Sequence, residues 1–223
     1  ANAAGWNNTD VDLILSAVDE PGGSGVSLIA YSIDGGDFVI HTGDSITLPF
    51  TDEGTYTVDY YSVDAAFNAE ATKTIEVRID TTAPVAGAEF ATVDQGGTVA
   101  TLDSGSNSVL SNDIDPPLNL ITAELASEPE FASAFSFNPD GTFTYSHDGS
   151  ENLSDSFTYQ VVDLAGNRTT SAVNIAVGVP KYDFTQASFS ESEQDGAATS
   201  NVVTLRRSGA TTVASSVDVV LTG

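Results

Sequence analysis

The chain contains no cysteine and no methionine, and only 6 of its 223 residues are lysine or arginine. Without cysteine no disulfide framework can form, and metal or redox sites built on thiolates are excluded. The 32 acidic residues give a formal net charge of −26. Because like charges repel, this charge disfavours binding to nucleic acids and to anionic membranes, and it favours solubility and the binding of cations.

Helical periodicity and long apolar runs are also scarce. No run is long enough to cross a bilayer, and we expect any export signal to lie outside this sequence. Short runs of alternating apolar and polar residues recur instead, separated by Gly, Asp, Asn and Pro. This spacing predicts an all-β protein made of tandem β-sandwiches. Strands are expected at 11–18, 45–50, 55–63, 73–79, 141–145, 155–162 and 171–177.

Alternation also predicts which side chains form the cores. Tyr56, Val58 and Tyr60 share one face of a strand, since successive side chains point to opposite sides. Burying one such side chain stabilises the fold by roughly 1.5–3 kcal/mol. The same pattern recurs in the second half of the chain. The further residues expected in a core are Phe157, Tyr159, Val161, Phe90, Phe131, Phe135, Phe137 and Phe143.

Two prolines mark the expected domain boundaries. Pro84 follows one alternating run and interrupts the strand ladder there, and Pro180 follows another. We therefore expect domains at 1–84, 85–179 and 180–223. The last segment holds only about three strands, too few for a two-layer sandwich. We expect it to be the N-terminal part of an incomplete module.

The pattern Y-x-x-x-D-x-A-x-N occurs twice, at Tyr60–Asn68 and at Tyr159–Asn167. One interpretation is scaffold, in which each Asp accepts hydrogen bonds from backbone N–H groups in a tight turn. The other is that the aspartates, including Asp163, contribute to cation sites. Phe67 stands where the second copy has glycine. Since Phe disfavours positive φ, we expect Asn68 to adopt the left-handed conformation and Phe67 to be exposed.

The segment "SNDIDPP" (111–117) is the best candidate for a metal site. In an extended segment Asp113 and Asp115 point to the same side. Two neighbouring carboxylates repel unless they are solvated, protonated or bridged by a cation. Calcium binds six to eight oxygens, so Asn112 fits as an accessory ligand. The alternative is an acidic surface loop with hydrogen-bonded turns.

Catalytic residues are not predicted. The only two histidines, His41 and His147, lie in polar, turn-rich surroundings, where a solvated loop histidine is expected. No spacing singles out one pair of acids, so we expect no catalytic residue and no enzyme activity. Exposed aromatics could form a sugar-stacking platform, and Trp6 and Tyr61 are the candidates, because Tyr61 should face outward.

The first part of the chain contains the stretches "SGV" (24–26), "YSIDGGDF" (31–38), "EGTYTVDYYSVDAAFN" (53–68) and "IDTTAP" (79–84). On these stretches residues 24–84 resemble a bacterial immunoglobulin-like module of secreted and surface proteins. The family pattern has glycine where Phe67 stands, and the resemblance implies a fold rather than a ligand.

The second half of the chain contains the stretches "VLSNDIDPPLN" (109–119), "NPDGTFTYSHDG" (138–149), "DSFTYQVVDLAGN" (155–167) and "VNIAV" (173–177). On these stretches residues 85–179 resemble the cadherin-like VCBS family of large bacterial surface proteins. Residues 182–207 read "YDFTQASFSESEQDGAATSNVVTLRR". This stretch is similar to the start of a Calx-beta module, and Glu193 stands where that family often places a calcium-binding glutamate.

Together the resemblances imply a segment of a large, adhesin-like, secreted or surface protein of bacteria. The expected function is a non-enzymatic structural or adhesive stalk, extracellular and stiffened by Ca²⁺ at acidic loops and module junctions. Its expected partners are neighbouring modules of the same chain and cell-surface or matrix glycans or proteins. No nucleic acid and no membrane insertion are expected. The alternative is an accessory carbohydrate-binding region of a secreted carbohydrate-active enzyme.

Overall fold

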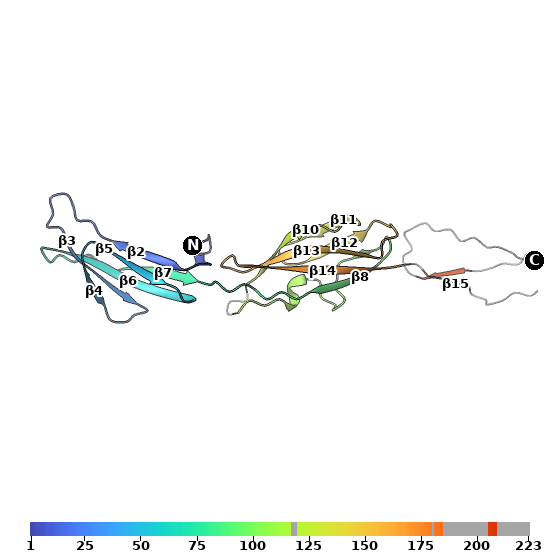
Figure 1. Ribbon diagram of the computed structural model, residues 1–223, viewed down its shortest axis with the longest axis horizontal. Coiled ribbons are helices and arrows are strands. Elements are labelled where there is room, and N and C mark those ends of the chain that lie inside the picture. Colours follow the sequence, from blue (N-terminus) through green and yellow to red (C-terminus); the bar gives the residue numbers. More distant parts are fainter. Residues whose placement is uncertain (117–119, 180, 185–204, 209–223) are drawn as a thin grey trace, which may run out of the picture. The chain divides into compact units, whose positions relative to one another are not determined.

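The computed structural model describes residues 1–116, 120–179, 181–184 and 205–208 (Figure 1). In this part of the chain β-strands dominate, and the sole helical element is the 3₁₀ helix η1 (Val109–Asn112). The all-β prediction is confirmed. No helix in the described residues is long and apolar enough to cross a membrane.

The chain divides into two compact units. Unit 1 comprises residues 1–84 together with two later segments, 115–121 and 162–168. Unit 2 comprises residues 85–114, 122–161 and 169–223. The first segment of unit 1 ends at Pro84, and the two later segments lie within the range 85–179 that was expected to form a separate domain.

Unit 1 contains a five-stranded sheet and a two-stranded sheet. The strand order of the larger sheet is β1-β7-β6-β3-β4, and β2 pairs with β5. Strand β1 runs parallel to β7, while the other pairs are antiparallel. The strands are β1 (Trp6–Asn7), β2 (Val11–Ser16), β3 (Val26–Ile33), β4 (Val39–Thr42), β5 (Ser45–Phe50), β6 (Gly54–Asp64) and β7 (Lys73–Ile79).

The core of unit 1 lies between these sheets. Val58 is fully buried, and Tyr56 and Tyr60 pack against the same apolar cluster, as the alternation predicts. The ring of Tyr56 lies 4.9 Å from that of Phe50 on β5. The buried residues of the cluster are Leu15, Ile29, Leu48, Phe50, Val58, Val77 and Ile79.

Unit 2 contains a four-stranded sheet of order β10-β13-β14-β8 and a three-stranded sheet of order β11-β12-β9. Strands β8 and β14 are far apart in sequence and pair in parallel (Figure 1). The strands are β8 (Glu89–Asp94), β9 (Thr98–Val99), β10 (Thr122–Ser127), β11 (Ala132–Phe137), β12 (Phe143–His147), β13 (Ser154–Val162) and β14 (Arg168–Gly178). Beyond them β15 (Lys181–Phe184) pairs with β16 (Leu205–Ser208).

Phe157 lies at the centre of the core of unit 2. It is fully buried, and its ring centroid lies 4.9 Å from that of Phe135, 5.7 Å from that of Phe137 and 5.5 Å from that of Phe143. Tyr159 and Val161 are fully buried on the same strand, as predicted. The other expected core residue, Phe131, is half-buried.

Phe90 is a wrong prediction, because its side chain is 58% exposed. Its neighbours Glu89 and Ala91 are buried, and so is Val93. Since side chains on a strand alternate, only one of the two sets can face the core. Here Ala91 and Val93 together determine the buried face, and the larger aromatic side chain of Phe90 lies on the outer face.

His147 is also not a solvated loop residue. It ends strand β12 and is 2% exposed. Its Nδ1 atom accepts hydrogen bonds from the backbone N–H groups of Gly96, at 3.2 Å, and Gly149, at 3.0 Å. The imidazole therefore fixes two turns at one end of unit 2, and its protonated nitrogen is Nε2.

We expect the His147→Ala variant to lose about 3 kcal/mol of unfolding free energy, from the lost acceptor and the cavity left behind. His147→Asn should retain about 1 kcal/mol more than the alanine variant, because its Oδ1 can take the place of Nδ1. Urea denaturation of the three proteins measures both differences. Equal losses in the two variants would contradict the role assigned to Nδ1.

The repeated motif forms the same turn twice. In the first copy the carboxylate of Asp64 accepts hydrogen bonds from the backbone and side-chain nitrogens of Asn68, at 2.7 and 2.8 Å. In the second copy Asp163 accepts the equivalent pair from Asn167, both at 2.8 Å. These contacts support the scaffold interpretation for both copies.

The prediction that Asn68 takes the left-handed conformation is wrong. That conformation belongs to Phe67, at φ 68°, and to Gly166 at the equivalent place, at φ 98°. The backbone and side-chain nitrogens of Asn68 both donate to the Asp64 carboxylate. The residue with positive φ is therefore the one before Asn68. Phe67 is 89% exposed, as expected.

A matched pair of substitutions tests whether the positive φ of Phe67 costs conformational free energy. Phe67→Gly should raise the unfolding free energy by about 0.5 kcal/mol, because glycine adopts positive φ without the steric cost that Phe incurs. Gly166→Ala should lower it by about 1 kcal/mol. A Cβ at Gly166 would meet only Asn8 Nδ2, at 4.0 Å, so the loss is conformational. Denaturant midpoints that shift in the same direction for both variants would refute this explanation.

Candidate metal centre

Three aspartates, Asp80, Asp115 and Asp163, meet in unit 1. One carboxylate oxygen of each lies within 4.8 Å of the others. Asp80 directly follows β7, Asp115 lies three residues after η1, and Asp163 directly follows β13. Their exposed fractions are 3%, 0% and 6%. Residues distant in sequence thus form one buried acidic cluster.

The second copy of the repeated motif helps to build this cluster. The side-chain nitrogen of Asn167 donates to Asp163 Oδ2 at 2.8 Å, and also to the backbone oxygens of Asp80, at 2.8 Å, and Thr82, at 3.2 Å. The backbone N–H of Asp80 donates to the Asn7 carbonyl at 2.9 Å. The side-chain amide of Asn167 therefore links the turn that carries Asp163 to the segment that carries Asp80.

The cluster is electrostatically unfavourable when all its carboxyl groups are charged. Burial raises the pKa of Asp115 to about 6, and the charges of Asp163, Asp80 and Glu53 add to this effect. Burial also raises the pKa of Asp80, with contributions from Asp163 and Glu53. In Glu53, hydrogen bonds from Thr81 and Thr82 lower the pKa, so this exposed neighbour stays charged.

One buried oxygen of the cluster lacks a hydrogen bond. Asp80 Oδ1 accepts from the Thr82 backbone N–H at 3.2 Å. Asp80 Oδ2 is buried, and no donor reaches it among the described residues. A buried carboxylate oxygen without a donor is costly unless a cation, a proton or a water neutralises it.

The donor set fits calcium. All three side chains offer hard carboxylate oxygens, which suit calcium and magnesium better than metals that prefer nitrogen or sulfur. Calcium–oxygen distances of about 2.3–2.6 Å allow two ligand oxygens of one ion to lie up to about 4.6–5.2 Å apart. The ligand oxygens of the cluster lie within 4.8 Å of one another, so they can share one calcium ion. Backbone carbonyls and water would complete its coordination.

The metal ligands predicted from sequence are distributed over different places. Asp115 and Asp163 belong to the cluster. Asp113 is buried elsewhere, where its Oδ1 accepts from Gly87 N at 2.8 Å and its Oδ2 lies 3.5 Å from the Tyr159 hydroxyl. Asn112 is exposed at the end of η1. Glu193 lies outside the described residues.

Asp80 is the cluster residue that sequence reasoning missed. It stands in "IDTTAP", a stretch that indicated only the end of a module. Its position directly after the last strand of unit 1 was the available signal, because residues at strand ends gather at one end of a sandwich. No periodicity links it to Asp115 or Asp163.

Part of the chain matches a known protein family, and the matched part contains two of the three aspartates of the cluster. Residues 81–179 match the family of bacterial cadherin-like domains. The matched region includes Asp115 and Asp163, and Asp80 is the residue immediately before it. No curated protein sequence matches the chain significantly.

Among solved structures, similar chains come from cadherins and a fibronectin type III-like protein. The human desmocollin-1 ectodomain is 14% identical at TM-score 0.34, and the match covers 83% of this chain and 40% of that one. The fibronectin(III)-like modules of Clostridium thermocellum CbhA are 10% identical at TM-score 0.38, with coverages of 85% and 93%. Drosophila N-cadherin EC1-4 is 14% identical at TM-score 0.34, with coverages of 77% and 44%.

Proposed function

We propose that this chain is a non-enzymatic, structural or adhesive segment of an extracellular bacterial protein, stiffened by calcium bound at Asp80, Asp115 and Asp163. The observation that carries the proposal is the convergence of three buried carboxylates, one of which has an oxygen that no donor among the described residues reaches. The bacterial cadherin-like match over residues 81–179 supports a structural or adhesive role. The proposed partners are neighbouring modules of a longer chain and surface glycans or proteins.

The proposed action of calcium is electrostatic. Without a cation the three carboxylates repel one another, and the segments that carry them separate easily. Bound calcium cancels this repulsion and joins residue 80 to segments 115–121 and 162–168. In the chain these two segments continue on both sides into unit 2. Calcium would thus hold these three segments of unit 1 together, with a Kd of about 10⁻⁴–10⁻³ M, common for extracellular modules.

A second cation position is proposed around Asp113 in unit 2. Burial raises the pKa of Asp113 and the pKa of Glu89. The negative charge of Asp113 raises the pKa of Glu89 further. Glu89 Oε1 is buried and has no donor among the described residues. Asn112 bonds to Glu89 and would be the accessory ligand. Glu193 stays a proposed ligand on the Calx-beta resemblance alone.

Thermal unfolding and small-angle scattering, each with chelator and with millimolar calcium, test the main site. The test variant is Asp80→Asn/Asp115→Asn/Asp163→Asn. The control variant, Asp12→Asn/Glu20→Gln/Asp37→Asn, removes three exposed acids of unit 1. Calcium should raise the melting temperature and reduce the flexibility of the wild type and the control, and it should do so less in the test variant, which keeps the other proposed cation positions. An equal calcium response in all three proteins would refute this site.

One observation favours carbohydrate binding as a second candidate. Tyr61 lies on the outer face of β6, and its ring centroid is 5.2 Å from that of Phe38, which is 44% exposed. The rings are inclined at 60°, so a sugar could stack on only one of them. Trp6 is half-buried in β1. Glycan-array binding that is lost in Tyr61→Ala would support this candidate, and no glycan binding by the wild type would remove it.

A further inference from the structure

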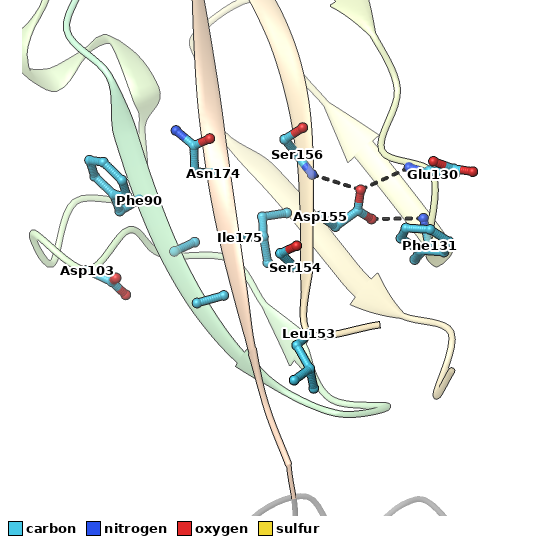
Figure 2. A pocket seen from close by; sticks show the side chains of 12 residues that line it. Phe90, Asp103, Glu130, Phe131, Leu153, Ser154, Asp155, Ser156, Asn174 and Ile175 are labelled. Atoms are coloured by element: carbon cyan, nitrogen blue, oxygen red, sulfur yellow. Dashed lines mark hydrogen bonds between the residues drawn. The ribbon is translucent and has the colours of Figure 1, made fainter. Parts of the chain in front are cut away.

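Unit 2 carries a cavity of about 500 Å³ that opens over β8, β13 and β14 (Figure 2). Its volume lies within the range of about 300–1,000 Å³ that is usual for ligand sites. Phe90 of β8 and Leu153, which precedes β13, line it, and each is 58% exposed. Two large apolar side chains are therefore held open to solvent beside the cavity.

Acidic side chains flank the cavity on both sides, with Asp103 at one side and Glu130 at the other (Figure 2). The backbone N–H of Asp103 donates to the Phe90 carbonyl at 2.8 Å, and its Oδ2 accepts from the Thr92 hydroxyl at 3.1 Å. The backbone N–H of Glu130 donates to Asp155 at 3.0 Å. Both side chains are exposed, and a backbone hydrogen bond holds each of the two residues in place.

The third acid, Asp155, supports the wall and does not face a ligand. Its carboxylate accepts from the backbone N–H groups of Glu130, Phe131 and Ser156, at 3.0, 2.9 and 2.7 Å (Figure 2). It also accepts from the Tyr145 hydroxyl at 2.9 Å. Asp155 therefore holds the Glu130 segment against β13 and leaves Asp103 and Glu130 as the accessible charges.

We propose that this cavity binds an extended basic peptide segment. Charge complementarity selects this occupant, because none of the described residues that line the cavity is Lys, Arg or His. The aliphatic part of an Arg or Lys would pack on Phe90 and Leu153, and its charged end would reach Asp103 or Glu130. An exposed aromatic ring adds a cation–π attraction. A second copy of this chain carries the same charge of −26 and is repelled.

Fluorescence anisotropy with a labelled, arginine-containing hexapeptide tests the proposal at physiological salt and millimolar calcium. A second probe carries citrulline in place of arginine, which keeps the shape and removes the charge. The wild type should bind the arginine probe and not the citrulline probe. Phe90→Ala should weaken binding about tenfold, and Asp103→Asn/Glu130→Gln at least as much.

Two control variants separate the cavity from the overall charge. Phe67→Ala removes another exposed aromatic, and Asp12→Asn/Glu20→Gln removes two exposed acids of unit 1; both should bind as the wild type does. The proposal is overturned if Phe90→Ala binds normally, or if the control acids weaken binding as much as the cavity acids. Binding of a neutral oligosaccharide that depends on Phe90, without binding of the arginine probe, would instead assign the cavity to glycans.

Discussion

Asp115→Asn is expected to stabilise the protein without calcium and to destabilise it with saturating calcium. The pKa of Asp115, raised from 3.8 to about 6, means that its charge costs roughly 3 kcal/mol in the folded state. Asparagine removes that charge but still buries an amide, so the expected gain is about 2 kcal/mol. Calcium at a hundred times Kd stabilises the wild type by about 2.7 kcal/mol. This exceeds the gain of about 2 kcal/mol that the variant has without calcium, so the wild type becomes the more stable of the two proteins.

Urea denaturation in chelator and in calcium measures this reversal directly. The exposed Asp12→Asn variant serves as the control, because it lowers the net charge equally and should follow the wild type in both conditions. If Asp115→Asn were destabilised without calcium, its carboxylate would be held by protein contacts rather than by a cation. That outcome would contradict the electrostatic account of the cluster.

The second large effect is a calcium response that disappears as the pH falls. Because the folded state raises the pKa of Asp115 to about 6, the folded protein binds this proton more tightly than the unfolded chain does. Without calcium, stability should therefore increase as the pH falls from neutral toward 4, by up to roughly 3 kcal/mol. Asp80, whose pKa is also raised, contributes in the same direction.

Protons and calcium compete for the same carboxylates, so the two stability curves should converge in acid. Below about pH 4 a different group of acids reverses the trend: Glu53, Asp64 and Glu70 have lowered pKa values, and their contribution is lost on protonation. Melting temperatures across this range, with and without calcium, give both curves. A calcium effect of equal size at neutral pH and at about pH 5 would show that calcium acts elsewhere.

Local patterns predicted the positions of several strands. The runs 45–50 and 73–79 form β5 and β7 with the expected bounds, because alternation and turn residues mark both ends. Phe90 shows the limit of this reasoning, since alternation defines two faces but does not say which one is buried. The parallel pairing of β14 with β8 also had no local signal, because it joins residues far apart in the chain.

The candidate site could be predicted only in part for the same reason. Asp115 was found through its neighbour Asp113, yet the two carboxylates have different surroundings. Asp163 was found through a repeated turn motif whose first copy shows that the turn needs no metal. Asp80 joins them only in three dimensions. Burial of His147 was equally invisible, because its backbone donors are supplied by turns at residues 96 and 149.

The most direct measurement is a crystal structure of the chain grown with calcium, with an anomalous difference map to locate the ion. The account predicts a peak within about 2.3–2.6 Å of carboxylate oxygens of Asp80, Asp115 and Asp163. Calcium found only at other residues, or a water molecule or a proton shared among these carboxylates at millimolar calcium, would contradict it.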